Sequence, residues 1–251
     1  MGQAELLGVI RRHPIWRRAD ERTVRALSAL VDDRRVPAGE AILSAGGKAD
    51  RIHLLVEGAA RVYYPATADG AEITVKLFWA PAAFGDAESV LRLSWAETVE
   101  ALTYSRVLVI EAGPYFRLMQ RDPSLCFRQY WDVARRFGVA IRSERSANLD
   151  DLEDRVIALL VAYANHFGVP EGGGLLIDHP LTQEAIAKQV GLKRRSVVDV
   201  LGRLYDSGVL VRVGRRYLVP DLTRLLRASR SAAPDLSFRT DEQPWAEPSG
   251  G

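Results

Sequence analysis

Three consecutive cations, Lys193-Arg194-Arg195, stand between two apolar stripes of helical spacing. Ahead of them, Thr182 can cap a helix, and Gly191 can end that helix in a left-handed conformation. The apolar residues of the two helices are Ala185, Ile186 and Val190, then Val197, Val200, Leu201 and Leu204. Cations at the start of a helix can contact phosphates and the acceptor edges of guanine bases. The alternative is an ordinary helical hairpin on a surface.

A helix, a glycine turn and a second helix with a cationic first turn are typical of a helix-turn-helix. In that motif the N-terminal residues of the second helix meet base edges in the major groove. The apolar spacing on both sides of Gly191 favours this interpretation over the surface hairpin. Two β-like runs follow, Leu210–Val213 and Tyr217–Val219, around a turn that contains Arg215 and Arg216. They predict a hairpin, or wing, beside the two helices.

The composition limits the class of protein. A chain of 251 residues that is 47% hydrophobic can hold two domains with proper cores. Its net charge of +2 means that any nucleic-acid surface must be a local patch. The single cysteine, Cys126, excludes an internal disulfide framework and fits a cytoplasmic setting. No apolar run approaches the roughly 20 residues of a membrane span, and no signal-peptide pattern opens the chain, so we expect no membrane partner.

The elements that must position the cations begin with helices over Gln3 to Asp32, broken at His13-Pro14. Between Arg35 and about Ala112 the texture changes to short β-like runs separated by glycine turns. These runs are residues 41–43, 52–56, 60–64, 73–78 and 107–110. Many short strands with a glycine at each corner predict a compact β-barrel or roll.

A long helix follows the roll, after a break at Asp122-Pro123. At helical steps it carries Tyr130, Val133, Phe137 and Ile141. This stripe is typical of a coiled-coil seam between two subunits. Packing of the helix against its own β-domain explains the spacing equally well.

The expected fold is α+β, with a β-roll, a long helix and a winged helix-turn-helix. Residues 1–122 form the N-terminal helices and roll, 123–149 the long helix and hinge, and 150–227 the DNA-binding domain. From Asp151 to Phe167 we expect a strongly apolar helix. Residues 228–251 are rich in Ser, Pro, Ala and Gly, which predicts a disordered tail.

This order of elements resembles the bacterial regulators named for the cyclic-AMP receptor protein and the fumarate–nitrate reduction regulator (CRP/FNR). The motifs that carry the resemblance are Val36 to Leu43, Val56 to Tyr63, Phe84-Gly85-Asp86, Asn148-Leu149, Leu181 to Glu184 and Arg194-x-Ser196-Val197. The resemblance implies that the roll is cyclic-nucleotide-binding-like and that the long helix is a dimerisation helix. It also implies a homodimeric transcription factor with two reading heads on a near-palindromic double-stranded DNA site. It places a hinge at Asp151 and Arg155, and it makes RNA polymerase a further candidate partner.

The resemblance also assigns roles at the DNA. Arg194 matches an arginine that contacts guanine, and a guanidinium can bind O6 and N7 together. Arg195 and Asp199 exchange the charges usual in the family. Asp199 could accept from a cytosine amine or hold Arg195 through an i, i+4 pair, and we favour the pair. Gln183 and Ser196 belong to the matched motif. The phosphate candidates are Thr182, Lys193, Arg215 and Arg216, the last two being equally well explained as solvated charge.

The roll departs from the family pattern at the cyclic-nucleotide site. That site needs Gly-Glu for the ribose and Arg-Ser for the phosphate, but the chain has Gly85-Asp86 and Trp95-Ala96. We therefore expect no cyclic AMP and predict no cofactor. The favoured interpretation is a collapsed pocket filled by Trp95, Phe84 and Trp79. The alternatives are a neutral or apolar ligand, or an anion held by Arg142 beside Ser143.

Catalytic and metal chemistry find no support in the motifs, since Walker-type loops, HExxH and Gly-x-Ser-x-Gly are all missing from the sequence. The four histidines are scattered, and Cys126 is a redox thiol or an inert small residue. We therefore predict that the chain is neither an enzyme nor a metalloprotein. The remaining alternative is an effector-binding or protein-interaction module whose DNA head is degenerate.

Overall fold

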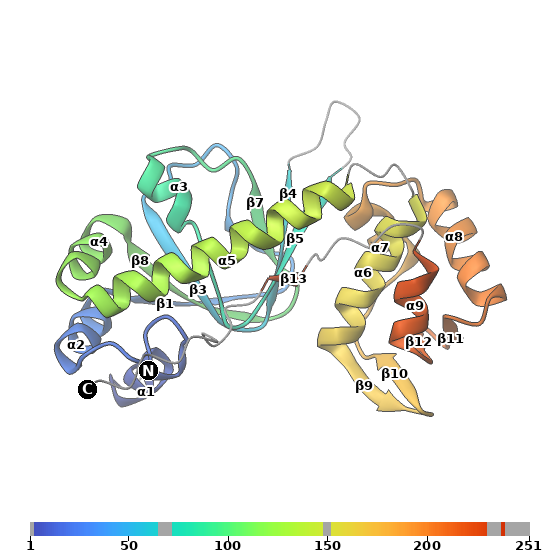
Figure 1. Ribbon diagram of the computed structural model, residues 1–251, viewed down its shortest axis with the longest axis horizontal. Helices are drawn as coiled ribbons and strands as arrows, with labels where there is room; N and C mark the ends of the chain where they lie inside the picture. Colours follow the sequence, from blue (N-terminus) through green and yellow to red (C-terminus); the bar gives the residue numbers. More distant parts are fainter. Residues whose placement is uncertain (1–2, 65–71, 148–151, 230–236, 239–251) are drawn as a thin grey trace. The chain divides into compact units, whose positions relative to one another are not determined.

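A computed structural model describes residues 3–64, 72–147, 152–229 and 237–238, and over residues 139–147 it describes the helical backbone alone. The chain divides into two compact units (Figure 1). Unit 1 is built mainly from the chain up to Val62 and from Leu77–Gly138, and unit 2 mainly from Val139–Ser237.

Unit 1 begins with two short helices, α1 (Gln3–Arg12) and α2 (Glu21–Leu30). The break between them falls at His13-Pro14, as the sequence predicts, because proline cannot continue the helical hydrogen bonds. Asp20 caps α2, and its carboxylate accepts from the amide of Thr23 at 2.6 Å. The cap fixes the point at which the chain re-enters a helix.

The β-roll consists of two antiparallel sheets. Their strands are β1 (Asp32–Val36), β2 (Ala41–Leu43), β3 (Arg51–Glu57), β4 (Ala59–Tyr64), β5 (Ile73–Trp79), β6 (Ala82–Phe84), β7 (Thr98–Ala101), β8 (Ser105–Glu111) and β13 (Ser237–Phe238). The strand order is β1-β8-β3-β6 in one sheet and β13-β5-β4-β7-β2 in the other. The predicted roll of short strands is confirmed.

Four strands of the roll were not predicted, namely β1, β6, β7 and β13. β1 is a run of charges, yet it pairs with β8 in unbroken register from Asp32↔Val109 to Val36↔Ser105. Backbone pairing is independent of side-chain polarity, so an outer strand needs no apolar alternation. β6 spans three residues, too few for a period of two to be visible.

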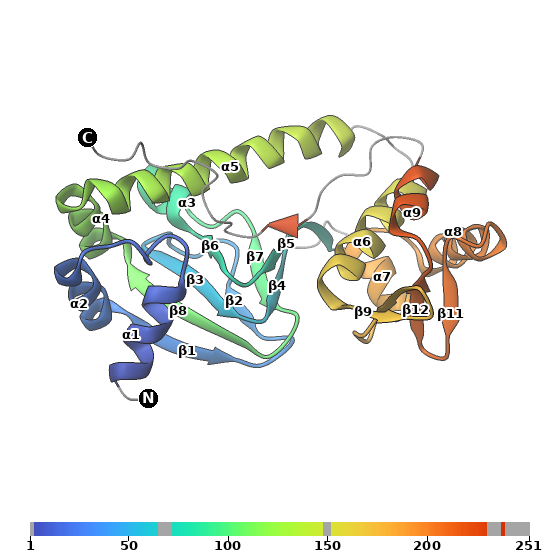
Figure 2. The ribbon, with the colours of Figure 1, turned by 60° about the horizontal axis from the view of Figure 1, so that its bottom comes forward.

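One hydrophobic cluster joins the N-terminal helices to the β1-β8-β3-β6 sheet. Its buried members include Ile10, Trp16, Val24, Leu27, Ile52, Leu54, Leu108, Ile110, Tyr115 and Leu125. On β3 and β8 these residues alternate, so one face of the sheet meets the helices and the other faces the interior of the roll. Figure 2 shows α1 and α2 beside β1 and β8.

Three further helices lie wholly or mainly in unit 1: α3 (Asp86–Leu91), α4 (Ala112–Arg121) and α5 (Pro123–Ala147), whose last nine residues belong to unit 2. The two faces of α5 differ. Leu125, Arg128, Gln129 and Asp132 are buried, whereas Tyr130 is 67% and Phe137 is 66% exposed. The helix thus packs against its own unit with one face and leaves its aromatic stripe uncovered.

Unit 2 contains α6 (Leu152–Phe167), α7 (Gln183–Val190), α8 (Arg194–Asp206) and α9 (Leu222–Ala228). Its sheet has the order β11-β12-β10-β9, with β9 (Gly168–Glu171), β10 (Gly174–Ile177), β11 (Val211–Val213) and β12 (Arg216–Val219). The wing hairpin is the β11–β12 pair. The sequence did not predict β9, because Gly168-Val169-Pro170-Glu171 lacks a strand pattern and pairs with β10 through its backbone.

Two predicted segments lie wholly or largely outside the described residues. The hinge region at residues 148–151 is one of them, and most of the tail from 228 to 251 is the other. Within the tail, Ala228 ends α9 and Ser237–Phe238 form β13 beside β5, so the prediction of disorder is wrong for these three residues. The physical reason is that an edge strand offers free backbone groups to any extended segment.

Candidate nucleic-acid interface and sensor region

The helix-turn-helix is fixed by local capping. Thr182 has an extended backbone, and its hydroxyl accepts from the amide of Ala185 at 3.0 Å. Gly191 ends α7 with φ 67°, and its amide donates to Ala187. Thr182 and Gly191 therefore act as the sequence predicts.

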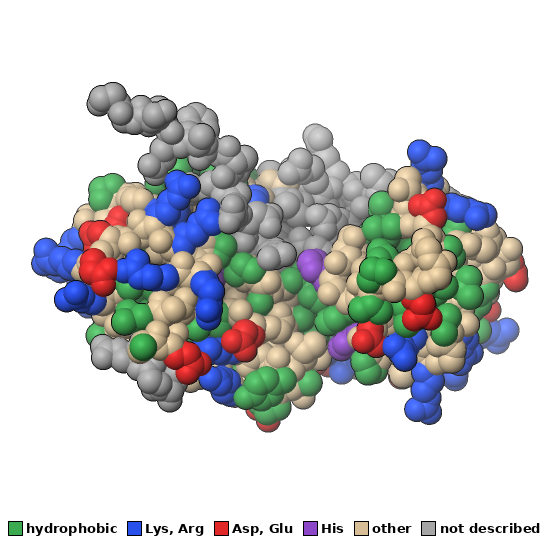
Figure 3. Space-filling view, turned by 90° about the horizontal axis from the view of Figure 1, so that it is seen from below, with side chains coloured by type: hydrophobic (Ala, Val, Ile, Leu, Met, Phe, Trp, Pro, Cys, Tyr) green, Lys and Arg blue, Asp and Glu red, His purple; other side chains and the backbone are tan. Residues whose placement is uncertain are grey.

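A buried stripe sets the orientation of α8. Val197, Val200, Leu201 and Leu204 are all at most 1% exposed. On the other side of the helix, Lys193, Arg194, Arg195 and Asp199 are exposed, and Ser196 is half-buried. In Figure 3, lysine and arginine side chains stand out at the edges of unit 2, on the right of the view.

The first turn of α8 is free to bind an anion. Lys193 is the N-cap residue, and no side chain of the described chain caps the helix there. Uncapped amides and the positive end of the helix dipole attract phosphate, and the adjacent cations add to this field. This helix start is therefore the most favourable place on α8 for a DNA backbone.

Arg194 links the two helices of the motif. Its guanidinium lies 3.4 Å from the side-chain oxygen of Gln183, which begins α7. Both residues belong to the predicted interface. The contact is long and therefore weak, so Arg194 can leave Gln183 to bind a base.

The predicted pair between Arg195 and Asp199 is wrong for the chain by itself, since no ion pair joins these two described residues. An exposed i, i+4 pair contributes only a few tenths of a kcal/mol. A cation placed before the acid is also the weaker orientation, because both charges oppose the helix dipole. Asp199 therefore stays available to another partner.

The two wing arginines differ. Arg216 lies 2.7 Å from Asp178, whereas Arg215 is exposed at the tip of the hairpin.

Of the predicted hinge residues, Arg155 is half-buried in α6, and Asp151 lies outside the described residues. Two contacts near Arg155 tie α6 to its neighbours: Glu153 pairs with Arg203 of α8 at 3.1 Å, and Asp154 accepts from Ser229 at 2.8 Å.

In the sensor region, several buried aromatic rings pack against one another. Phe84 stacks on His53 with centroids 5.3 Å apart and on Phe78 at 4.9 Å. Trp95 meets the edge of His53 at 5.9 Å, and Trp79 is buried as well. The apolar surroundings, together with Arg34 and Arg51, lower the pKa of His53 to about 4. His53 is therefore neutral at physiological pH.

Gly85 lies at the tightest point of this region. Its φ is 84°, and a Cβ there would lie 2.6 Å from Trp95 and 2.9 Å from the carbonyl oxygen of Arg51. Ala96, next to Trp95, is exposed. Arg142, Ser143 and Ile141 were also predicted as site residues, but their side chains lie outside the described part of the structure.

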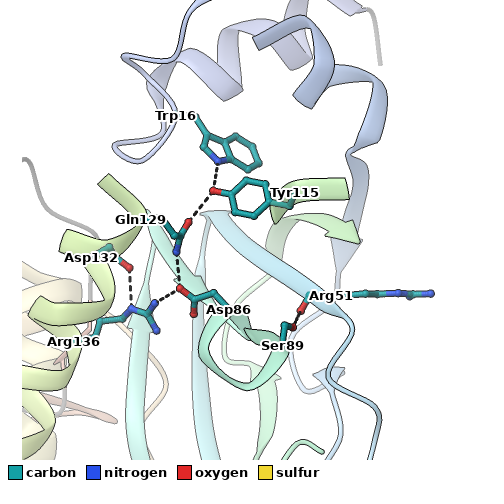
Figure 4. Close-up of polar contacts among 8 residues, drawn as sticks. All are labelled: Trp16, Arg51, Asp86, Ser89, Tyr115, Gln129, Asp132 and Arg136. Carbon is teal, nitrogen blue, oxygen red and sulfur yellow. Dashed lines mark hydrogen bonds and ion pairs between the residues drawn. The ribbon is translucent and has the colours of Figure 1, made fainter. Parts of the chain in front are cut away.

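Asp86 makes an unexpected set of contacts. It is 2% exposed, and its Oδ2 accepts from Gln129 and from Arg136, both on α5. Arg136 also donates to Asp132 at 2.8 Å (Figure 4). We call Asp86, Gln129, Asp132 and Arg136 the buried anchor. The sequence analysis named Asp86 and missed the other three, since a polar residue on a helix is expected to face water.

The anchor extends to the N-terminal segment. Tyr115 donates to Gln129 at 2.7 Å, and Trp16 donates to Tyr115 at 3.0 Å. Burial, together with Asp86 and Asp132, raises the pKa of Tyr115, so its hydroxyl stays a neutral donor. Arg136 remains charged, because Asp86 and Asp132 raise its pKa more than burial lowers it.

Two hollows lie away from these rings. One of about 360 Å³ is lined in part by Leu30, Arg34, Arg51 and Val109, and the other, of about 310 Å³, by Arg34, Val36, Ile42 and Val107. Neither is lined by the predicted sensor residues. Because Asp32 and Glu111 line the first and Glu40 lines the second beside the arginines, the mixed charges favour no single ligand class.

Comparison with known proteins supports the same two parts. A model of the cyclic nucleotide-binding domain matches residues 33–122, and a model of the Crp-like helix-turn-helix domain matches residues 154–228. The chain is 24% identical over 222 residues to a CRP-like cAMP-activated global transcriptional regulator of Mycobacterium tuberculosis, covering 88% of this chain and 99% of that one. It is 27% identical over 177 residues to the global nitrogen regulator of Synechococcus elongatus, covering 68% and 78% of the two chains.

Solved structures share the fold. A CRP-family regulator from Thermus thermophilus matches with TM-score 0.63 at 24% identity, covering 80% of this chain and 99% of the other. The c-di-GMP-responsive regulator CLP of Xanthomonas campestris matches with TM-score 0.68 at 17% identity, covering 80% and 100%.

A cyclic-nucleotide-binding-type roll followed by a winged helix-turn-helix defines a DNA-binding transcription regulator. More particularly, the chain belongs to the CRP/FNR family of transcription regulators. In the described part of the chain, no helix is both long and apolar enough to cross a membrane.

Proposed function

We propose that this chain acts in the cytoplasm as a homodimeric regulator that binds a near-palindromic DNA site in a sequence-specific way. The observation that carries the proposal is the start of α8, where Lys193, Arg194 and Arg195 are exposed around an uncapped helix N-terminus. The buried stripe behind them holds this helix in one orientation. We propose no catalytic role, and RNA polymerase is the natural protein partner of such a regulator.

Arg194 is the proposed base-reading residue. Its guanidinium can match the geometry of guanine O6 and N7, at the cost of a long contact to Gln183. Arg195, Ser196 and Asp199 complete the reading face. Because Asp199 is not occupied by Arg195, acceptance from a cytosine amine becomes the better interpretation of this carboxylate.

Thr182, Lys193 and Arg215 are the proposed phosphate contacts. Arg216 joins them only if it releases Asp178, since the two side chains lie 2.7 Å apart in the free chain. Phosphate contacts supply affinity and salt dependence without reading sequence.

The proposed dimer seam runs along α5 through Tyr130, Val133, Phe137 and Ile141. It is supported by the exposure of Tyr130 and Phe137, because large aromatic side chains on one helix face mark an interaction surface. Two subunits joined by α5 would present two copies of α8. Asp151 and Arg155 are the proposed hinge residues between α5 and the heads.

For the sensor, we propose that the chain does not respond to cyclic AMP. The Mycobacterium tuberculosis relative is described as cAMP-activated. In this chain the Arg-Ser pair is replaced by Trp95-Ala96, and Phe84, Trp79 and Trp95 fill the interior. A cyclic phosphate would therefore find no cation at the usual position.

The experiment that tests the proposed function is selection of bound sequences from genomic fragments with the purified full-length chain. We expect enrichment of a near-palindromic motif whose half-site differs from the cyclic-AMP receptor consensus. Random recovery of fragments would contradict sequence-specific binding. Calorimetric titration with cyclic AMP and cyclic GMP tests the sensor, and micromolar binding of either would overturn the proposal for the roll.

A further inference from the structure

The carboxylate of Asp86 is already used by the protein. It stands where a family ligand site would offer an acid to a ligand hydroxyl, yet its Oδ2 accepts from both Gln129 and Arg136 of α5. Arg136 has a side-chain exposure of 16%, and Asp86 has one of 3%. A ligand hydroxyl could reach this oxygen only by displacing two protein donors.

Displacing Arg136 would also disturb a second carboxylate. Its Nε donates to Asp132 at 2.8 Å, and the Asp132 side chain has no exposure to solvent. Removing one partner from a buried ion pair leaves an uncompensated charge, which is strongly unfavourable. The Oδ2 side of Asp86 is therefore closed against a competing ligand by the charges of the anchor, whereas its Oδ1 is buried and accepts no hydrogen bond from the described residues.

The anchor also fixes how α5 is rotated. Gln129, Asp132 and Arg136 are spaced three and four residues apart, so they share one face of the helix. Their partners are fixed elsewhere: Asp86 begins α3, and Tyr115 of α4 connects Gln129 to Trp16. Turning α5 by one residue would break all of these bonds together. Buried polar groups of this kind specify one register rather than adding much stability.

That rotation decides which side chains α5 presents outward. With the anchor face buried, Tyr130 and Phe137 are exposed. Both sides of the helix are thus set by contacts within one chain. From Arg136, α5 continues for roughly 16 Å to its end at Ala147, near the proposed hinge.

We infer that the buried anchor replaces a small-molecule effector, so that α5 is held in its DNA-binding arrangement without any ligand. The inference rests on the proposed function, because it assumes that the chain binds DNA as a dimer through α5 and α8. On this inference, the DNA-binding activity of the regulator is set by the amount of the protein or by a partner.

The test compares three full-length proteins, each unfolded and refolded so that any bound small molecule is removed. The first is the natural chain, and the second is the double variant Asp86→Ala/Arg136→Met, which removes the anchor pair. The matched control is Glu100→Ala/Arg61→Met, which removes another buried ion pair of the roll, with both nitrogen–oxygen distances at 3.0 Å. The control pair joins β4 to β7, two strands of the roll.

Affinity is measured by fluorescence anisotropy on the DNA selected with the natural chain. We expect the stripped natural chain to bind, with less than about a twofold change on adding cyclic AMP or cyclic GMP. The anchor variant should bind at least about tenfold more weakly while folded by circular dichroism, and the control should stay within about twofold. If the double variant does not fold, Asp86→Asn keeps the volume and one acceptor oxygen, and we expect about a fivefold loss.

Two results would overturn the inference alone. In the first, the stripped natural chain binds DNA only after a small molecule is added. In the second, the folded anchor variant, or Asp86→Asn, binds as tightly as the natural chain. If the chain selects no DNA in either its purified or its stripped form, the proposed function fails and the inference falls with it.

Discussion

Arg136 of α5 and Asp86 at the start of α3 form a buried ion pair, although 50 residues separate them in the sequence. The pair places the carboxylate of Asp86 inside the protein's own hydrogen-bond network. Two features distinguish the sensor as we propose it. Trp95-Ala96 takes the place of the phosphate-binding pair, and the guanidinium of Arg136 already binds the carboxylate of Asp86.

Gly85→Ala should destabilise unit 1. The backbone there has φ 84°, and the new Cβ would lie 2.6 Å from the Trp95 ring. We expect a loss of about 2–4 kcal/mol in the free energy of unfolding, measured by urea denaturation. The control is Gly202→Ala in α8, where a Cβ meets nothing within 4 Å and the φ is helical. It should stabilise the protein by about 0.5–1 kcal/mol. Equal effects of the two substitutions would contradict this account of the turn.

His53 should make the protein sensitive to acid. Its pKa is lowered from 6.5 to about 4 in the folded chain, so the unfolded chain binds the proton more tightly. The contribution of neutral His53 to the free energy of unfolding is fully present above pH 6.5 and is lost as the pH falls toward 4. The free energy of unfolding should fall between about pH 7.5 and about pH 5. In His53→Phe this fall should be smaller by about 2 kcal/mol than in the natural chain. Urea denaturation at the two pH values measures it, and an unchanged pH dependence in the variant would contradict the assignment.

Tyr130→Asp should dissociate the dimer, because it places a charge in the centre of the proposed seam. Sedimentation velocity at micromolar concentration should show a dimer for the natural chain and a monomer for the variant. The control is Val90→Asp on α3, which places the same charge at a position of similar exposure outside the seam and should leave the dimer intact. Val90 is 61% exposed and Tyr130 is 67% exposed. A dimeric Tyr130→Asp would place the subunit contact elsewhere.

Lys193→Ala should weaken DNA binding about equally for all sequences, because a phosphate contact reads no base. The slope of log affinity against log salt should fall by about one in magnitude. Arg227→Ala on α9 removes an exposed cation from another helix and should leave the slope unchanged. A sequence-dependent loss with Lys193→Ala would instead make Lys193 a base contact.

The reading head was predictable from the sequence because its signals are local. Thr182 bonds three residues ahead, and Gly191 ends α7 where its lack of a side chain permits φ 67°. The buried stripe of α8 likewise follows from helical spacing alone. For the same reason, the weak pair between Arg195 and Asp199 was overestimated, since spacing permits a contact without showing that it forms.

The buried anchor was not predictable, because its bonds join distant parts of the chain. Trp16 and Tyr115 are 99 residues apart, and Asp86 and Gln129 are 43 apart. Gln129, Asp132 and Arg136 have the polarity of a solvated helix face, and only the packed structure turns that face inward. β1 was missed for a related reason, since its strand identity comes from pairing with β8 and not from its own charged residues.

The most direct test of the account is the effect of Arg194→Ala on binding to the selected DNA. Fluorescence anisotropy should show a loss of about 1–3 kcal/mol in binding free energy, with relaxed preference at one base pair of each half-site. Binding to unrelated DNA should hardly change. If Arg194→Ala binds the selected site as tightly and as selectively as the natural chain, α8 does not read the bases through this residue, and the central claim is contradicted.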